Sequence, residues 1–364
     1  MMPSAAVEQS ASDQMPVTVP SVSQFVWREL RLLVVLGALS FGAALCVRYG
    51  LHYPIPLTDM SVPRRMRQAL RYTALLGPVL LLIRLLRQRL ALRGADGRPV
   101  PGRAGWSLAL AALRQDALAA RFALVVSTVL VMAGLFSVFA LWKASIPVLA
   151  PWRWDPMLVA VERALHGGVL PQDVTRSWFG PRATVVLDDL YSLWLRLVAL
   201  FVVWQSLRAP APGRMRALLA LALTYTLLGN VGGMLLSSGG PVYYDRLVGE
   251  SGPYAAQAAY LAAIPGLHAT AMQRSIWDWV QSGTYVPFAT ISAMPSMHVG
   301  VTTVMALACR ERNRWFGVAG WLYVCLILLG SVHLNWHYAI DGYVAIVGVL
   351  AVWWFSGWLV RRYA

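Results

Sequence analysis

Runs of about 20 apolar residues recur along this chain, and they restrict its fold more than any other feature. An α-helix needs roughly 20 apolar residues to cross about 30 Å of hydrocarbon. Of the 364 residues, 58% are hydrophobic and only 13% charged, so a soluble domain could not bury the apolar surface. We therefore predict an all-α, polytopic bundle of six to eight membrane helices, with eight as the expected count. The expected spans are 32–47, 69–86, 122–142, 190–207, 217–238, 288–309, 315–334 and 342–360.

The chain divides into three expected parts. Residues 1–24 are small and polar with no hydrophobic period, which is typical of a disordered tail. Residues 25–142 hold the first membrane helices and a basic loop, and residues 143–364 form the remaining membrane domain. The proline at position 295 interrupts the sixth apolar run, so we expect that helix to start near Pro295.

The distribution of arginine residues along the chain predicts the orientation of the protein in the membrane. The net charge is +15, and Lys143 is the only lysine. Such an excess usually lies in cytoplasmic loops and against anionic lipid head groups, and no nucleic-acid motif is present. With eight spans, most of the arginine-rich loops fall on one side, which we expect to be cytoplasmic; only the stretch around Arg64, Arg65 and Arg67 falls on the other. We expect a multi-pass protein of a bacterial inner membrane.

Two short polar motifs lie at the edges of the last apolar runs. Pro295, Ser296, Met297 and His298 form the first, and His337 is followed four residues later by Asp341. Residues four apart on a helix share a face, so Asp341 can reach His337. One histidine can protonate a leaving oxygen, and a second can attack phosphorus while a carboxylate orients its ring. These residues predict a phosphoryl-transfer site on the extracytoplasmic side.

The segment 238–246, SGGPVYYDR, falls on the same side of the membrane. Gly239 and Gly240 allow the backbone to approach a ligand closely, and Arg246 offers a bidentate fork for phosphate oxygens. We expect these residues to bind the substrate phosphate, with Tyr243 beside them and the hydroxyl of Ser296 as a further donor.

Other readings of the same residues remain open. His298 alone is compatible with an interfacial histidine at a helix start, and the 238–246 segment with a structural turn. The spacing of His333, His337 and Asp341 would also suit a metal, although Asn335 and Trp336 break the helical face between them. We expect no metal and no other cofactor, because arginine and helix-dipole charges can neutralise a phosphate.

Together, PSMH and HxxxD about 40 residues apart resemble the second and third motifs of the type 2 phosphatidic acid phosphatase superfamily of membrane lipid phosphatases and phosphotransferases. The GGPVYYDR segment, Trp154-Asp155-Pro156 and the stretches 162–168 and 187–194 resemble its inositolphosphotransferase branch, typified by inositol phosphorylceramide synthase. The resemblance extends over about 152–360, and it implies a phosphatase/haloperoxidase-like helical core.

The resemblance also assigns roles. It implies His337 as the nucleophile, Asp341 as its orienting partner, and His298 as acid and then base. The superfamily's lysine followed by an arginine-proline pair is absent here, and Gly330-Ser331 replaces the Ser-Arg pair of the third motif. These departures leave Arg246 as the expected phosphate ligand.

The implied activity is transfer of a phosphoryl head group, with inositol phosphate as the expected group, from a phospholipid donor to a lipid or polyol hydroxyl through a phosphohistidine. A lipid phosphate phosphatase is the alternative with the same residues. A non-catalytic transporter or scaffold is the alternative of another class, although no internal repeat is visible. The sequence does not indicate the oligomeric state.

Overall fold

In a computed structural model of the chain, the placement of residues 21–50, 52, 82, 85–86, 89–92, 100–115, 118–249, 252–283 and 290–363 is described. Most of the expected tail 1–24 and almost all of the expected span 69–86 lie outside these residues. Val22 opens the first helix, so residues 22–24 belong to a helix and not to the tail, and the hydroxyl of Ser21 caps it.

All the regular secondary structure of the described residues is helical, as the apolar runs predict. The first half contains α1 (Val22–Leu45), η1 (Cys46–Gly50), α3 (Gly102–Gln115), α4 (Leu118–Leu149), α5 (Asp155–Leu165), α6 (Pro171–Trp178), α7 (Pro181–Ser192) and α8 (Trp194–Leu207). The second half contains α9 (Pro212–Leu223), η3 (Thr224–Gly232), α10 (Gly233–Leu235), η4 (Pro241–Tyr243), α11 (Tyr244–Val248), α12 (Ala255–Ala262), α13 (His268–Gln281), α14 (Met297–Arg312), α15 (Arg314–His333) and α16 (Ala339–Tyr363).

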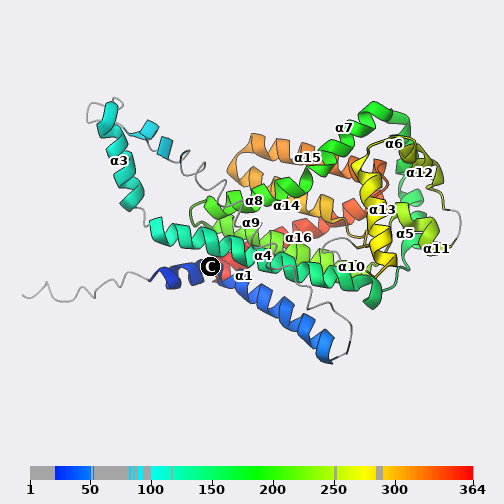
Figure 1. Cartoon of the computed structure of the whole chain (residues 1–364), viewed down its shortest axis with the longest axis horizontal. Coiled ribbons are helices and arrows are strands. Elements are labelled where there is room, and N and C mark those ends of the chain that lie inside the picture. Colours follow the sequence, from blue (N-terminus) through cyan, green and yellow to red (C-terminus); the bar gives the residue numbers. More distant parts are fainter. Residues whose placement is uncertain are drawn as a thin grey trace, which may run out of the picture.

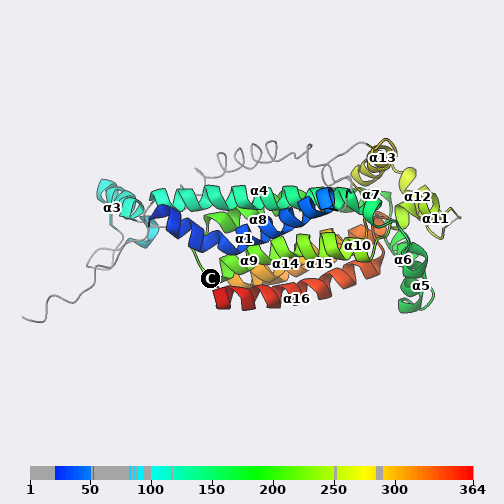
Figure 2. The ribbon, with the colours of Figure 1, turned by 90° about the horizontal axis from the view of Figure 1, so that it is seen from below.

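The long helices run side by side in one elongated bundle (Figures 1 and 2). Helix α14 packs against α15 and α16, α16 packs against α9, and α1 packs against α4. Among the described residues, five helices are long and apolar enough to cross a membrane: Val22–Gly50, Ala120–Leu149, Pro212–Leu235, Arg314–His333 and Ala339–Tyr363. Helices α8 and α14, of 14 and 16 residues, lie among these. The protein is therefore an all-α integral membrane bundle.

The start of α14 differs from the expectation. The helix begins at Met297, and Ser296 is its N-cap, with the side chain accepting from the N–H of Val299 at 3.4 Å. Pro295 therefore precedes the cap and is not the first helical residue. The polar serine takes this place because its oxygen can accept from an otherwise unpaired N–H group of the first turn.

Short helices cover one end of the bundle. Helices α5, α6 and α11–α13 gather at that end, and α3 lies at the opposite end (Figures 1 and 2). The N-termini of α14 and α16 both point towards the covered end, so the first residues of these helices meet the short helices. We name α5, α6 and α11–α13 the cap.

Buried carboxylates of α5 attach the cap to the bundle. Asp155 accepts from the N–H groups of Gly239 and Gly240, at 2.8 and 2.9 Å, and from the hydroxyl of Tyr338 at 2.7 Å. Its side chain is almost fully buried. A carboxylate that accepts several hydrogen bonds holds its donors in one arrangement, so Asp155 fixes the 238–241 turn against the start of α16.

Glu162 does the same for the first turn of α16. One oxygen accepts from the N–H of Ala339 at 2.7 Å, and the other accepts from the N–H of Ile340 at 3.1 Å. These amides have no partner inside their own helix, so a carboxylate from α5 satisfies them and complements the helix dipole. Burial raises the pKa of Glu162, and the two N–H donors act against that rise.

Candidate active site

The two predicted motifs meet at the covered end of the bundle. The Nδ1 atom of His298 lies 3.2 Å from the Nε2 atom of His337, and the Nδ1 atom of His337 lies 3.1 Å from Oδ2 of Asp341. His337 and Asp341 are buried, with 5% and 0% of their surfaces exposed. We name these three residues the triad.

The contact within the HxxxD motif is made across a turn. His337 precedes α16, which begins at Ala339, so the two residues do not share a helical face as the spacing suggested. The backbone N–H of His337 donates to the carbonyl of Ser331 at 3.1 Å, and its own carbonyl accepts from Gln172 of α6 at 3.3 Å. One contact from the bundle (Ser331) and one from the cap (Gln172) therefore hold His337 in place.

Aromatic rings hold the second histidine. The ring of Tyr191 stacks on His298 with centroids 5.0 Å apart, and the ring of Trp194 meets it edge-on at 4.4 Å. These contacts restrict the rotation of the imidazole, whose Nδ1 atom then faces His337. Both aromatic residues come from α7 and α8, within the stretch 187–194 that the sequence singled out.

The chemical state of His337 follows from its surroundings. Burial lowers the pKa of His337 to about 3, and the positive charge of Lys143 acts in the same direction. The ring is therefore neutral near pH 7. With the proton on Nδ1, shared with Asp341, the Nε2 atom carries a lone pair and faces His298. A neutral imidazole with a lone pair on Nε2 is the form that can attack phosphorus.

Lys143 of α4 lies near the triad but belongs to none of the sequence motifs. Phe139, Lys143 and Ile146 follow the helical spacing and lie on one face of α4. Phe139 and Met297 both lie against Gly229, and Ile146 lies against Gly233 together with the hydroxyl of Ser292. This face of α4 therefore turns towards the 292–298 segment. Lys143 lies on the face between Phe139 and Ile146, which make these contacts.

The only lysine thus faces the triad from inside an apolar helix. Among the described residues, no carboxylate lies within ion-pair distance of its ammonium group. An ionisable residue within a membrane helix usually has a functional reason. The sequence indicates Lys143 only as a single lysine in an apolar run. The motifs do not reveal which face of the helix this lysine occupies.

The two glycines of the 238–246 segment occupy a different role from the expected one. Their N–H groups both donate to Asp155, so they are engaged within the protein and are not aimed at a ligand. A side chain at Gly240, with φ of +83°, would lie 2.8 Å from the carbonyl oxygen of Trp336. The glycine is needed for close backbone packing beside the triad.

Ser296 and Tyr243 are also engaged. Ser296 is fully buried and caps α14, while its N–H donates to the carbonyl of Asp341 at 3.1 Å and so joins the two motifs. The hydroxyl of Tyr243 donates to the carbonyl of Gln273 in α13 at 2.8 Å. Both residues therefore shape the surroundings of the site.

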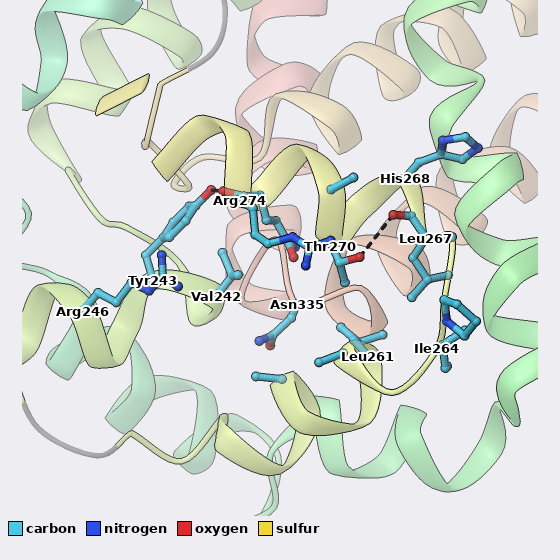
Figure 3. Close-up of a pocket in the computed structure, with 16 residues that line it drawn as sticks. Val242, Tyr243, Arg246, Leu261, Ile264, Leu267, His268, Thr270, Arg274 and Asn335 are labelled. Atoms are coloured by element: carbon cyan, nitrogen blue, oxygen red, sulfur yellow. Dashed lines mark hydrogen bonds between the residues drawn. The ribbon is translucent and has the colours of Figure 1, made fainter. Parts of the chain in front are cut away.

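Arg246 lies in the cap. Its side chain is exposed, and its guanidinium sits over the ring of Trp277 at 4.7 Å. It lines a cavity of about 530 Å³ between α11, α12 and α13, shown in Figure 3, and no member of the triad lines that cavity. The structure therefore brings together His298, His337 and Asp341, with Ser296 beside them, and places Arg246 in a neighbouring pocket.

The metal alternative receives no geometric support. The Nε2 atom of His333 contacts the hydroxyl of Thr184 at 2.9 Å. Within the described residues, no group of three histidine, cysteine or acidic side chains is arranged to hold a metal ion.

Comparison with known proteins identifies the family of this chain. The family model described as the PAP2 superfamily matches residues 156–355, more than half of the chain. This range contains the triad, whereas Lys143 lies outside it. Neither a search of the curated proteins nor one of the solved structures found a match.

Proposed function

Since the chain belongs to the PAP2 superfamily, whose members are typically phosphoesterases or phosphotransferases, we propose that it transfers a phosphoryl-linked head group between lipids through a phosphohistidine at His337. The hydrogen-bonded triad is the observation that carries this proposal. Following the sequence resemblance, the donor is a phospholipid with an inositol phosphate head group and the acceptor is a lipid hydroxyl. The site faces the extracytoplasmic side.

In the first step, Nε2 of His337 attacks the phosphorus of the donor. The bond between phosphorus and the diacylglycerol oxygen breaks, and its electron pair stays on that oxygen. His298 takes up a proton when the anionic phosphoryl group binds beside it, and it gives that proton to the departing oxygen. Asp341 accepts the Nδ1–H of His337 and stabilises the positive charge that develops on the ring. The products are diacylglycerol and a phosphohistidine whose phosphoryl group still carries the inositol.

In the second step, the acceptor hydroxyl attacks the same phosphorus. Its proton passes to His298, which regains the proton lost in the first step, and the phosphorus–nitrogen bond breaks with its electron pair returning to Nε2. Because His298 and His337 are 3.2 Å apart in the structure, the phosphoryl group must enter between the two rings and replace their hydrogen bond.

Lys143 is proposed to neutralise the phosphoryl oxygens. The charge on these oxygens grows in the transition state, and a fixed cation in a water-poor site stabilises it more strongly than one in water. Lys143 faces the triad and has no carboxylate partner among the described residues. It therefore takes the part that the sequence assigned to Arg246 and to the two glycines.

Transfer and hydrolysis differ only in what accepts the phosphoryl group. The test is incubation of the purified protein with phosphatidylinositol labelled in its head group, with and without ceramide or a diacylglycerol whose acyl chains differ from those of the donor. Label in a new lipid establishes the transferase. Free labelled inositol phosphate or phosphate establishes the hydrolase.

The phosphohistidine has a separate test. A donor labelled at phosphorus should leave an acid-labile, alkali-stable label on the wild-type protein when the acceptor is omitted. His337→Ala should give neither label nor turnover. His166→Ala is the matched control, because this histidine contacts Tyr343 outside the triad. Equal labelling of the wild type and His337→Ala would exclude His337 as the nucleophile.

A further inference from the structure

The cavity of about 530 Å³ in the cap is separate from the triad. Helices α12 and α13 form most of its walls, and Figure 3 shows Asn335 at the centre of the drawn side chains, with Arg246 at one end and His268 at the other. Its size is within the range of small-molecule sites, and its lining mixes aliphatic and polar side chains. The proposed chemistry of the triad does not use this cavity.

Asn335 is the most informative residue of its lining. It is 1% exposed, and neither the nitrogen nor the oxygen of its side-chain amide has a hydrogen-bond partner among the described residues. Leaving a buried amide without hydrogen-bond partners destabilises a protein. The backbone of Asn335 has φ of +64°, a conformation that asparagine tolerates better than most residues. The amide is held in the cavity, where a ligand can satisfy both atoms.

Two guanidinium groups add positive charge to the same cavity. Arg246 from α11 and Arg274 from α13 both line it, and neither forms an ion pair with a carboxylate of the described residues. His268, by contrast, contacts Asp189 at 3.3 Å. Guanidinium groups bind phosphate oxygens through paired N–H donors.

The remaining lining suits hydroxyl groups on a carbon ring. A hydroxyl both donates and accepts, and the amide of Asn335 offers one acceptor and two donors. The hydroxyl of Thr270 in α13 also lines the cavity; it donates to the carbonyl of Leu267 at 3.2 Å and can still accept a hydrogen bond. Leu261 and Ile264 supply aliphatic surface for the ring carbons.

We propose that this cavity is a second binding site, in which Arg246 and Arg274 hold the phosphate and Asn335 the hydroxyl groups of a phosphorylated polyol. The ligand is either a soluble polyol phosphate or the head group of a lipid. The inference concerns binding and does not depend on the proposed transfer chemistry. Asn335 lies two residues before His337, so an occupied cavity would lie directly behind the turn that carries the nucleophile.

The experiment measures binding to full-length protein in phosphatidylcholine nanodiscs. His337→Ala is used as the background, so that turnover cannot consume a probe and failure of the proposed chemistry leaves the binding measurement intact. The probes are glucose 6-phosphate, glucose and inorganic phosphate, followed by calorimetry. Glucose 6-phosphate should bind saturably, and glucose and inorganic phosphate should each bind about tenfold or more weakly, because each lacks one half of the contacts.

Variants test the assigned contacts. Arg246→Ala and Arg274→Ala should each weaken glucose 6-phosphate binding by about tenfold or more, the range for a hydrogen bond to a charged group. Asn335→Gly, which keeps the backbone conformation, should weaken glucose 6-phosphate binding and leave inorganic phosphate unchanged. Arg182→Ala is the matched control, since this exposed arginine of α7 does not line the cavity.

Three results would overturn the proposal: no saturable binding of glucose 6-phosphate, unchanged binding in both arginine variants, or an equal loss in Arg182→Ala. A last arm distinguishes the source of the ligand. If nanodiscs containing phosphatidylinositol displace glucose 6-phosphate, the head group of a lipid reaches the cavity from the membrane. If they do not, while soluble polyol phosphates still bind, the ligand is a soluble one.

Discussion

In the proposed mechanism, the hydrogen bond between Asp341 and His337 decides which ring nitrogen attacks phosphorus. The Asp341 carboxylate accepts from Nδ1, which leaves the lone pair on Nε2. Asp341→Asn keeps the side-chain shape and presents either an N–H or a weaker acceptor to Nδ1. We expect turnover to fall on the order of a hundred-fold or more, because the ring loses its tautomer and the charge that stabilises it.

The measurement is kcat for head-group transfer, on protein whose helix content and thermal unfolding match the wild type. A near-normal kcat in Asp341→Asn would show that the pair is structural and that another group orients His337.

A second prediction at this scale concerns Lys143. Lys143→Met keeps the length and apolar stem of the side chain and removes the charge. We expect kcat/KM to fall by roughly a hundred-fold, about the effect of removing one donor of an oxyanion site. Stability should be unchanged or higher, because an unpaired charge in an apolar helix is costly.

A lower kcat/KM with unchanged or higher stability would show that Lys143 acts through its charge and not as a structural residue. The check is a parallel measurement of kcat/KM and of the thermal unfolding midpoint in the same detergent. Loss of both together would identify Lys143 as a structural residue, and an unchanged rate would remove it from the site.

The sequence predicts that His298, His337 and Asp341 lie close together, but it does not predict which charged groups surround them. His298, His337 and Asp341 lie in short motifs at the ends of apolar runs, so their meeting follows from the order of the helices. Lys143 lies at a distance in sequence, and only the packing of α4 reveals that it faces the same place. The sequence does not predict the role of the N–H groups of Gly239 and Gly240, since their acceptor Asp155 comes from a helix more than 80 residues earlier.

At the scale of elements, the start of α16 depends on α5. The carboxylate of Glu162 accepts from the N–H groups of Ala339 and Ile340, within the turn that leads from His337 to Asp341. Glu162→Gln removes the charge and places an amide N–H₂ against one of these donors. We expect a loss of about 1.5–3 kcal/mol of stability, the range for hydrogen bonds to charged groups, and a lower kcat because Asp341 shifts.

The measurement compares thermal unfolding and kcat of Glu162→Gln with those of Glu311→Gln. Glu311 pairs with Arg216 at 2.7 Å near the other end of the bundle, where both side chains are partly exposed. An ion pair of that kind contributes about 0–1 kcal/mol. Equal effects of the two substitutions would show that Glu162 has no special link to the triad.

Element by element, the apolar runs predict the long helices but not the cap. The expected span 122–142 lies inside α4 (Leu118–Leu149), and the expected span 342–360 lies inside α16. The cap helices are too short to contain an apolar run of membrane length, and α5 and α13 are amphipathic. The placement of α5 depends on the buried carboxylates of Asp155 and Glu162, and the sequence does not show which distant N–H groups these carboxylates accept from.

At the scale of the whole molecule, the two ends of the bundle differ in charge and in covering. The cap and the triad occupy one end. At the other, Arg216 pairs with Glu311, and the guanidinium of Arg31 donates to the carbonyl of Tyr363. Arg310, Arg312, Arg361 and Arg362 belong to the last turns of α14 and α16, which point away from the cap.

This separation of charge predicts how the protein lies in the membrane. Arginine-rich ends remain in the cytoplasm, so the cap and the triad should face the extracytoplasmic side. In a background with Cys46, Cys309 and Cys325 replaced by alanine, we expect a membrane-impermeant maleimide to label Ala259→Cys in the cap of intact cells. Tyr363→Cys, exposed at the opposite end, should be labelled only after permeabilisation. The reverse pattern would place the triad in the cytoplasm, where the lipid donors and acceptors would have to come from the inner leaflet.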